Sequence, residues 1–446
     1  MPSNSPAPLK SVRSQRCGPL TGCIDAPGDK SISHRSLIFG GLASGVTRIT
    51  GLLESGDVLD TAKAMTALGA TVEHTGTGNW SVTSKDGKLR NPHAPLDFGN
   101  SGTGVRLVMG ACAGAGVSAQ FIGDQSLSSR PMARVITPLG LMGTKLEANR
   151  NRLPISMTAS KLNAIKYAPP VASAQVKSAI LLAALGAEGE TLVTEAQSTR
   201  DHTERMLALF GVKIDVSRND RGLTARLVGP QTLSACEIAV PGDPSSAAFA
   251  VVAALITPGS KIQINGVMDN PARTGLYTTL KEMGADLVLK PGVMKAGEKT
   301  IDITAQYSTL SGITVPAERA ASMIDEYPVL GVAAAFARGE TAMLGLDELK
   351  AKESDRLAGT ADMLRGNGVI VDVNENSLAV HGSDGAPAAG GGIVQTRHDH
   401  RLAMSGFVLG LRCTDPVTID DASMIATSYP NFFDHMATLG APMECV

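Results

Sequence analysis

The sequence has few aromatic residues and almost no net charge. Phe, Trp and Tyr make up 3% of its 446 residues, whereas surfaces that stack nucleic-acid bases depend on aromatic side chains. The 40 Lys and Arg residues nearly balance the 42 Asp and Glu residues, which leaves a formal charge of −2. Such a charge provides no overall attraction to nucleic acid or to a membrane surface. We therefore expect no nucleic-acid partner, and any basic binding surface must be local.

Cysteines and long apolar runs are also scarce. The six cysteines form no CxxC pair, which argues against a zinc site or a disulfide framework and favours the cytoplasm as the location. No apolar run reaches the roughly 18–20 residues of a membrane helix. Residues 1–18 lack the apolar core of a secretory signal and read as a frayed tail. We expect no association with a membrane.

Glycine is abundant, with 48 residues, and six of them mark an internal repeat. Each follows a helix-like stretch and precedes a strand-like run, as in MTALGATVE at 65–73. A glycine just past a helix is a common cap because it adopts positive φ without strain. The spacings are 74, 68, 73, 84 and 72 residues, which predicts six copies of one structural unit. The marking residues are Gly69, Gly143, Gly211, Gly284, Gly368 and Gly440.

Each copy also contains an earlier and more apolar helix, which we expect to be buried on most sides. One unit then reads strand, buried helix, strand, amphipathic helix, glycine, strand, strand. The segment 386–392 reads as a flexible loop inside the fifth unit. The six apolar helices are predicted at 33–43, 104–115, 174–186, 246–256, 326–337 and 401–412.

The two halves of the chain echo each other. Pro27-Gly28-Asp29 resembles Pro241-Gly242-Asp243, which lies 214 residues later, about three units. We therefore predict an α/β protein of two similar domains with three units each. The domains are predicted at 25–239 and 240–446, and the tail and first strand at 1–24 join the later domain.

Unusual polar clusters fall at the predicted helix starts, where unpaired backbone N–H groups favour an anion. The first cluster places Lys30, Ser31 and Arg35 after a glycine turn. Its spacing is not that of a P-loop, and an ordinary capped helix with surface cations would also explain it. Repetition of such clusters favours a cleft between the domains, lined by helix N-termini, Lys and Arg and suited to phosphates and carboxylates. Further clusters begin at Asn100, Ser129, Ser173, Thr199, Asp325, Lys352 and His398.

Two carboxylic acids, Asp325 and Glu353, lie in this basic setting and could transfer protons. Ordinary acidic residues at helix starts are the alternative reading of both. His398 and His400 have the spacing of a metal-ligand pair, but no third ligand cluster supports it. We predict neither a metal nor an organic cofactor.

The motifs together resemble the 5-enolpyruvylshikimate-3-phosphate synthase family of enolpyruvyl transferases. They spread over nearly the whole chain except the first twenty or so residues, and as a set they are highly specific. They are PGDKSISHR (27–35), FGNSGTGVRL (98–107), LSSRPM (127–132), ASAQVKSA (172–179), TRDHTE (199–204), VPGDPSSAAF (240–249), IDEYP (324–328), KAKESDRL (350–357) and HDHRLAM (398–404).

The resemblance implies a fold and a reaction. The fold is an inside-out α/β arrangement of two domains, each with three βαβαββ-type units, which close around the substrates. In the reaction, the 5-hydroxyl of shikimate 3-phosphate attacks C2 of phosphoenolpyruvate while C3 is protonated. A tetrahedral intermediate then loses phosphate. The family expectation is a monomer without a cofactor.

The resemblance also implies roles for residues in the matching motifs. Asp325 is expected to accept the hydroxyl proton and Glu353 to protonate C3, with Lys352 beside the hydroxyl. Lys30 and Gln175 are expected to lie between the two substrates. The residues expected to hold shikimate 3-phosphate are Ser31, Arg35, Ser173, Ala174 and Arg200. Those expected to hold phosphoenolpyruvate are Gly102, Arg130, Arg356 and Arg401.

The sequence also departs from the family pattern in places. The Ser173-Ala174-Gln175 triplet and Leu107 resemble the class II branch. Many members have a lysine near the phosphoenolpyruvate phosphate where this chain has Thr427 and Ser428. Glyphosate-tolerant class II relatives tend to carry alanine where this chain has Gly102. Our hypothesis is that this protein binds glyphosate better than those relatives do.

Two alternatives belong to other functional classes. The UDP-N-acetylglucosamine enolpyruvyl transferases share the fold but carry a reactive cysteine in a loop that matches 123–132, which contains no cysteine here. The second alternative is a non-catalytic protein that binds phosphorylated ligands on the same fold. Asp325, Lys352 and Glu353 argue against it, because binding alone needs no acid–base pair.

Overall fold

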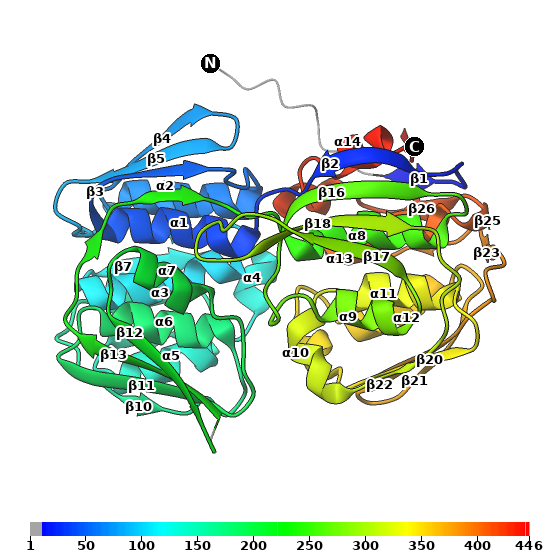
Figure 1. Ribbon diagram of the computed structural model, residues 1–446. Helices are drawn as coiled ribbons and strands as arrows, with labels where there is room; N and C mark the ends of the chain where they lie inside the picture. Colours follow the sequence, from blue (N-terminus) through cyan, green and yellow to red (C-terminus); the bar gives the residue numbers. More distant parts are fainter. Residues whose placement is uncertain (1–10, 221, 442, 446) are drawn as a thin grey trace. The chain divides into compact units, whose positions relative to one another are not determined.

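The computed structural model describes residues 11–220, 222–441 and 443–445 (Figure 1). The chain divides into two compact units. Unit 1 comprises Met1–Pro27, Gly242–Val293 and Lys299–Val446, and unit 2 comprises Gly28–Pro241 and Met294–Glu298. The chain therefore changes unit at 27/28 and 241/242. The five residues Met294–Glu298 were not anticipated as part of unit 2.

Unit 2 is built from three sheets and the helices between them. The sheet orders are β14-β3-β5-β4 with β15 also beside β3, β6-β7-β9-β8, and β10-β11-β13-β12. The strands are β3 (Ala43–Thr50), β4 (Thr71–Gly76), β5 (Asn79–Ser84), β6 (Leu96–Asp97), β7 (Ala119–Ile122), β8 (Lys145–Ala148), β9 (Ile155–Thr158), β10 (Lys166–Tyr167), β11 (Gly189–Glu195), β12 (Ile214–Asn219), β13 (Gly222–Gly229), β14 (Leu233–Ser234) and β15 (Glu237–Ala239). The helices are α1 (Lys30–Leu42), α2 (Gly56–Ala67), α3 (Gly102–Ala115), α4 (Gln125–Ser129), α5 (Ala133–Leu141), α6 (Ala174–Ala184), α7 (His202–Leu209) and the short 3-10 helix η1 (Asn149–Asn151).

Unit 1 repeats this plan. Its sheet orders are β17-β18-β16-β2, β19-β20-β22-β21 and β24-β26-β1-β27, and β23 pairs separately with β25. The strands are β1 (Val12–Ser14), β2 (Thr21–Asp25), β16 (Lys261–Met268), β17 (Asp286–Pro291), β18 (Thr300–Gln306), β19 (Thr314–Val315), β20 (Glu340–Leu344), β21 (Ile370–Val373), β22 (Ser377–His381), β23 (Ala388–Gly390), β24 (Ile393–Val394), β25 (Cys413–Asp415), β26 (Val417–Ile419) and β27 (Glu444–Cys445). The helices are α8 (Pro244–Ile256), α9 (Gly275–Glu282), α10 (Ala320–Met323), α11 (Tyr327–Ala335), α12 (Arg356–Arg365), α13 (His400–Gly410), α14 (Phe432–Thr438) and the 3-10 helices η2 (Ala317–Arg319), η3 (Asp347–Ala351) and η4 (Ser423–Thr427).

The six larger sheets share one pairing pattern. A short strand runs parallel to its neighbour and the longer strands pair antiparallel, as in β10 with β11, β11 with β13, and β13 with β12; beside β3 there are two such short strands, β14 and β15. The last sheet follows the same pattern but takes β1 from the beginning of the chain, which pairs with β26 and β27. Similarly, β14 near the end of unit 2 runs beside β3 near its beginning. Each unit therefore closes on itself through strands from its two ends.

The six predicted apolar helices correspond to α1, α3, α6, α8, α11 and α13. All thirteen residues of α8 are buried, as expected for a helix that is apolar on every side. In unit 2, α3 and α6 pack closely because Gly110 has no side chain. A Cβ at this position would lie 2.3 Å from the Ala179 carbonyl oxygen.

The six repeat glycines all have positive φ, between 84° at Gly211 and Gly368 and 107° at Gly143, which confirms them as helix caps. Two other expectations were wrong. The segment 386–392 contains β23, which pairs with β25. The supposed frayed tail at 1–18 contains β1, whose Val12 is fully buried, while residues 1–10 lie outside the described residues.

Candidate active site

The predicted site residues form two groups, one in each unit, and each group is brought together within its own unit. In unit 2 the first turn of α1 presents Lys30, whose ammonium group forms an ion pair with Asp57 near the start of α2. Asp29 caps α1 by accepting a hydrogen bond from the Ile32 N–H at 2.8 Å. This cap fixes the helix start, and Asp57 fixes the direction of Lys30.

Arg35 joins three helix starts in unit 2. Its Nε donates to Thr203 Oγ1 on α7 and its Nη2 to Ser178 Oγ on α6, both at 2.8 Å. Its Nη1 donates to the Ser31 carbonyl at 2.9 Å. Burial, with the nearby Lys30 and Arg35, holds the pKa of His34 well below its usual value, so this ring is neutral. The guanidinium of Arg35 is thus held in one place.

Gln175 connects α6 to α3. Its Nε2 donates to Thr103 Oγ1 at 2.9 Å, and its Oε1 accepts from Arg106 Nη1 at 2.8 Å. Gly102 begins α3 beside these groups and is buried. A Cβ there would lie 2.9 Å from Arg106 Nη1 and 3.1 Å from Arg130 Nη1. Glycine is therefore what lets two guanidinium groups approach the start of α3.

Of the remaining predicted residues of unit 2, Ser173, Ala174 and Arg200 lie at the starts of α6 and α7, whereas Arg130, expected at a helix start, is the C-cap residue of α4. Arg130 donates through Nη2 to Asn100 Oδ1 at 2.5 Å and to Ser126 Oγ at 3.3 Å. Ser173 is the N-cap residue of α6, Ala174 is the first residue of that helix, and Arg200 lies two residues before α7. These three are half-buried, so unit 2 gathers cations and helix N-termini, which suits anionic ligands.

In unit 1 the central group is Arg356, which is fully buried among three carboxylates. Its Nη1 donates to Asp325 Oδ1 and its Nε to Asp399 Oδ2, at 2.9 and 2.8 Å, and its Nη2 forms an ion pair with Glu353. Burial alone would lower the pKa of Arg356, but Asp399, Glu353 and Asp325 raise it above its ordinary value. These carboxylates therefore hold the guanidinium in place.

Asp325 is surrounded by three cations. Besides Arg356, Lys352 Nζ lies 3.8 Å from its Oδ1, and Arg401 Nη1 donates to its carbonyl oxygen at 3.2 Å. The neighbouring Glu326 is buried, and burial raises the pKa of its carboxyl although Arg401 lies 3.6 Å away. A carboxylate among cations can accept a proton and pass it on.

Two of the contacts in these groups were not predicted from the sequence: the ion pair of Asp57 with Lys30 and the contact of Asp399 with Arg356. Asp57 carries no motif, and its only signal is an acidic residue in the first turn of α2. Asp399 lies within the motif that suggested a histidine metal pair, but it caps α13 and binds Arg356. Arg273 in unit 1 is also buried, and it donates to Asp243 at 3.0 Å.

In the described residues, one group has metal-ligand geometry, and it is not the pair His398 and His400. It consists of Asp201, His202 and Glu298 in unit 2. His202 Nδ1 lies 2.8 Å from Glu298 Oε1, and Arg205 Nε lies 2.8 Å from Asp201 Oδ2 and 3.6 Å from Glu298 Oε2. Arg205 already neutralises these carboxylates, so nothing here indicates a cation site.

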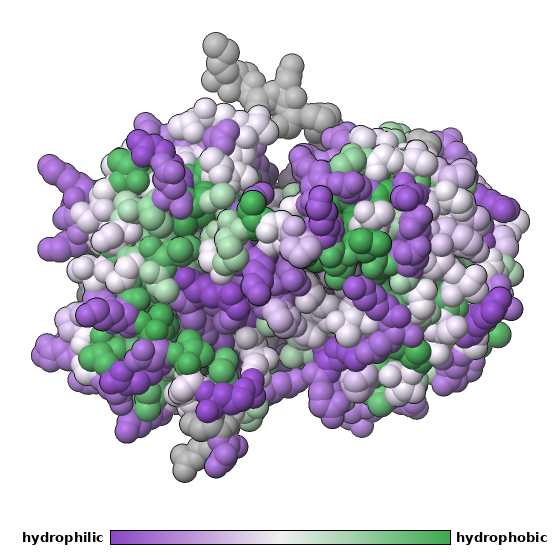
Figure 2. All heavy atoms as spheres, viewed as in Figure 1, coloured by the Kyte–Doolittle hydropathy of each residue, from purple (hydrophilic) through white to green (hydrophobic). Residues whose placement is uncertain are grey.

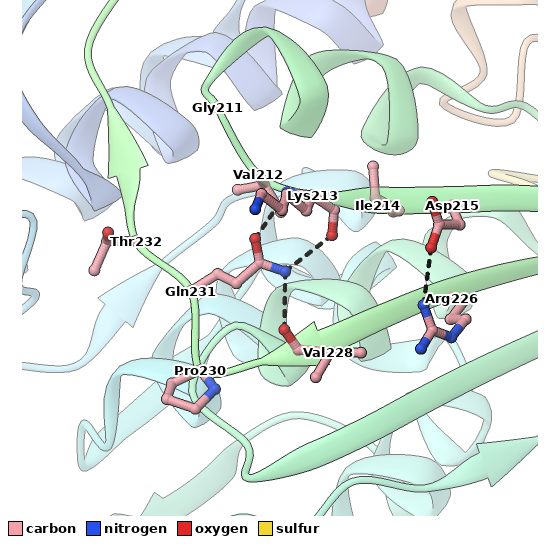
Figure 3. Close-up of a pocket in the computed structure, with 10 residues that line it drawn as sticks. All are labelled: Gly211, Val212, Lys213, Ile214, Asp215, Arg226, Val228, Pro230, Gln231 and Thr232. Atoms are coloured by element: carbon pink, nitrogen blue, oxygen red, sulfur yellow. Dashed lines mark hydrogen bonds and ion pairs between the residues drawn. The ribbon is translucent and has the colours of Figure 1, made fainter.

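A hollow of about 890 Å³ lies on unit 2, and none of the predicted site residues line it (Figure 3). Its polar groups bond to one another. Gln231 exchanges hydrogen bonds with the backbone of Lys213, and Arg226 pairs with Asp215 at 2.9 Å. Hydrophobic residues gather over β12 and β13 on this face (Figure 2), including the exposed Val216 and Val228. We assign this hollow no ligand.

Among the described residues, no helix combines the length and apolarity required to cross a bilayer.

Comparison with known proteins gives consistent matches along the whole chain. Residues 14–436 match the family model described as EPSP synthase (3-phosphoshikimate 1-carboxyvinyltransferase). The chain is 62% identical to the 3-phosphoshikimate 1-carboxyvinyltransferase of Maricaulis maris, with 97% of each chain covered. It is 56% identical to the enzyme of the same name from Parvibaculum lavamentivorans, covering 99% of this chain and 98% of the relative.

Solved structures agree with the sequence relatives. An EPSP synthase from Acinetobacter baumannii superimposes with a TM-score of 0.87 at 41% identity, covering 97% of this chain and 99% of that one. The enolpyruvyl transferase NikO from Streptomyces tendae superimposes with a TM-score of 0.76 at 17% identity, over 98% of this chain and 99% of its own. The second likeness shows a shared fold.

Proposed function

Because the chain belongs to the EPSP synthase family, we propose how its residues divide the work of that reaction. The enzyme transfers the enolpyruvyl group of phosphoenolpyruvate to the 5-hydroxyl of shikimate 3-phosphate and releases phosphate, in the shikimate pathway to chorismate and the aromatic amino acids. The match to relatives of this name over 97% and more of the chain carries the conclusion and favours it over the UDP-N-acetylglucosamine acceptor and the non-catalytic alternative. The residue roles that follow are our proposal.

Shikimate 3-phosphate is held by residues at helix starts in unit 2: Ser31, Arg35, Ser173, Ala174 and Arg200. Arg35 supports this role because three hydrogen bonds fix its guanidinium. A fixed, planar cation binds phosphate with little loss of side-chain entropy. Ala174 contributes its backbone N–H at the first position of α6, where N–H groups lack helical partners.

Phosphoenolpyruvate carries a phosphate and a carboxylate, so it needs several cations. Arg130, Arg356 and Arg401 supply them, and Gly102 leaves room beside them. Lys30 and Gln175 contact both substrates. Arg356 binds three carboxylates in the structure. The anionic groups of phosphoenolpyruvate can replace one of these carboxylates, so the guanidinium can change partners when the substrate binds.

The chemistry falls to Asp325 and Glu353. Asp325 accepts the proton of the 5-hydroxyl while the hydroxyl oxygen forms a bond to C2 of phosphoenolpyruvate. Lys352 lies beside that hydroxyl. Glu353, released from Arg356 when the substrate binds and then protonated, donates that proton to C3, which gives a tetrahedral intermediate with a methyl group. Return of one methyl proton to Glu353 then expels phosphate, which takes the proton held by Asp325, and leaves the enolpyruvyl ether. Preorganised cations stabilise the charge of the intermediate, and these steps involve no cofactor.

The substrates are small molecules, and we further propose that the enzyme acts as a monomer in the cytoplasm. The family expectation supports the monomer. The six cysteines, which form no disulfide in the structure, support the cytoplasm. Light scattering after size-exclusion chromatography would give 46 kDa for a monomer. A mass near twice that value would contradict it.

Phosphate release tests the proposed function. We expect release only when shikimate 3-phosphate and phosphoenolpyruvate are both present, and we expect it to continue in EDTA. Asp325→Asn should lower kcat at least a thousandfold, because no base remains, while the affinity for shikimate 3-phosphate measured by calorimetry changes little. Asp362→Asn, at an exposed aspartate of the same unit that pairs with Arg397, is the matched control and should leave kcat unchanged. Equal loss of binding and turnover in Asp325→Asn would contradict the assigned role.

A further inference from the structure

Lys177 is a cation in the interior of unit 2 that the reaction as described does not use. Its side chain is 1% exposed, and its ammonium group lies 2.8 Å from Glu195 Oε2 and 2.8 Å from Glu204 Oε1. Lysine is almost never fully buried unless it is paired, because removing its charge from water is costly. An apolar residue of similar volume would fill this space at lower electrostatic cost. The charge must therefore serve something other than packing.

The three charged groups come from three elements that meet near the proposed shikimate 3-phosphate residues. Lys177 lies in the first turn of α6, two residues after Gln175. Glu195 ends β11, and Glu204 lies in the first turn of α7. One buried ammonium group thus joins the beginnings of two helices.

Glu195 extends this link to the segment that carries Arg200. Thr199 Oγ1 donates to Glu195 Oε1 at 2.6 Å, and the Thr199 N–H donates to Glu195 Oε2 at 3.4 Å. Arg200 follows immediately in the chain. Two contacts therefore connect Lys177, through Glu195, to the residue before Arg200.

The neighbouring residues on both helices repeat the connection with neutral groups. Ser178 Oγ lies 2.7 Å from Thr203 Oγ1, and both accept hydrogen bonds from Arg35. Positions 177 and 178 of α6 thus contact 204 and 203 of α7. The neutral pair, Ser178 and Thr203, orients Arg35. The charged pair, Lys177 and Glu204, lies next to it, and Lys177 also binds Glu195.

We propose that Lys177, held between Glu195 and Glu204, is a positioning residue that sets the distance between the start of α6 and Arg200, and thereby the affinity for shikimate 3-phosphate. This inference rests on the proposed assignment of Ser173, Ala174 and Arg200 to that substrate. Attraction to Lys177 opposes the rise that burial causes in the pKa of Glu204, and the two carboxylates keep the pKa of Lys177 above its ordinary value. The ammonium group therefore remains charged in the working range of pH.

The test separates the two substrates. Lys177→Met keeps the length of the side chain and removes the charge. We expect KM for shikimate 3-phosphate to rise ten- to a hundredfold, while KM for phosphoenolpyruvate changes less than threefold and kcat less than fivefold. Lys177→Arg should restore part of the affinity, because it retains a cation.

Controls distinguish positioning from general loss of stability. Leu182→Ala removes a buried side chain farther along α6 and should lower the melting temperature without changing KM for shikimate 3-phosphate. Thr199→Val removes the shorter hydrogen bond to Glu195, that of the hydroxyl, and should raise that KM three- to tenfold, even if Lys177→Met does not fold. A Lys177→Met enzyme that behaves like Leu182→Ala, or that raises both KM values equally, would overturn the inference.

Arg200→Ala separates this inference from the proposed substrate assignment. If Arg200→Ala raises KM for shikimate 3-phosphate but Lys177→Met and Thr199→Val do not, only the positioning role falls. If Arg200→Ala also leaves that KM unchanged, the substrate assignment and the positioning role fall together.

Discussion

At Gly102 the absence of a single methyl group determines how closely two arginines approach the start of α3. An added Cβ would lie 2.9 Å from Arg106 Nη1 and 3.1 Å from Arg130 Nη1, both nearer than ordinary van der Waals contact. Both atoms are at the ends of flexible side chains, so the arginines can move aside while the helix stays in place. The position therefore adjusts ligand affinity and leaves the fold intact.

We predict that Gly102→Ala raises the inhibition constant for glyphosate at least tenfold and KM for phosphoenolpyruvate severalfold, as measured by inhibition kinetics. Gly56→Ala is a matched control, because Gly56 also begins a helix but a Cβ there would meet no atom within 4 Å. We expect that variant to match the parent enzyme. An unchanged inhibition constant in Gly102→Ala would contradict the hypothesis.

Single residues were predictable where a motif carried them. Ser173, Ala174 and Gln175 were found at the start of α6 as expected, and Asp325 was found just before α11. Asp57 could not be found, because its partner Lys30 is 27 residues away and only the packing of α2 on α1 brings them together. The threefold engagement of Arg356 was hidden for the same reason, since two of its three partners lie far away in the sequence, at 325 and 399.

At the level of helices, unit 2 depends on backbone contact between α3 and α6. Gly110 and Gly114 would place a Cβ 2.3 Å from the Ala179 carbonyl oxygen and 2.5 Å from the Leu182 carbonyl oxygen. Neither backbone can move without displacing its whole helix. Such a contact keeps the starts of both helices, with Gly102 and Gln175, at a fixed separation.

We predict that Gly110→Ala lowers the free energy of unfolding by about 3 kcal/mol or more, because overpacking at backbone has no flexible side chain to absorb it. Gly140→Ala in α5 is the control, since nothing lies within 4 Å of its added Cβ, and it should raise stability by up to ~1 kcal/mol through helix propensity. Urea denaturation, with hydrogen exchange of α3 and α6, measures both. Equal stability of the two variants would contradict the role of close packing.

Elements were easier to predict than contacts because each repeat carries its own signals. The positive-φ glycines and the apolar helices recur six times, so each copy supports the others. The short β23 at Ala388–Gly390 was missed, because three small residues among glycines lack a strand-like pattern, and only pairing with β25 orders them.

At the level of the whole molecule, each unit is completed by strands distant in sequence. Val12 on β1 pairs with Ile419 and with Cys445, and it is fully buried. Arg13 on the same strand is exposed. The beginning of the chain therefore belongs to the core of the last sheet, which composition alone could not reveal.

We predict that Val12→Asp destabilises unit 1 by about 3–5 kcal/mol, because it buries an unpaired charge. Hydrogen exchange should accelerate in β24, β26 and α13, while the strands of unit 2 keep their protection. Arg13→Asp on the same strand should leave both patterns unchanged. Faster exchange throughout the protein in Val12→Asp would contradict independent cores in the two units.

The five residues Met294–Glu298 have a practical consequence for dissecting this enzyme. The strands on either side, β17 and β18, belong to unit 1, but Glu298 supplies the buried partner of His202 in unit 2. A gene fragment that encodes residues 28–241 alone would lack Met294–Glu298. His202 would then have no carboxylate partner, and the place of these five residues in unit 2 would be empty. A study of unit 2 by itself should therefore supply the 294–298 peptide in trans, or graft it to the fragment.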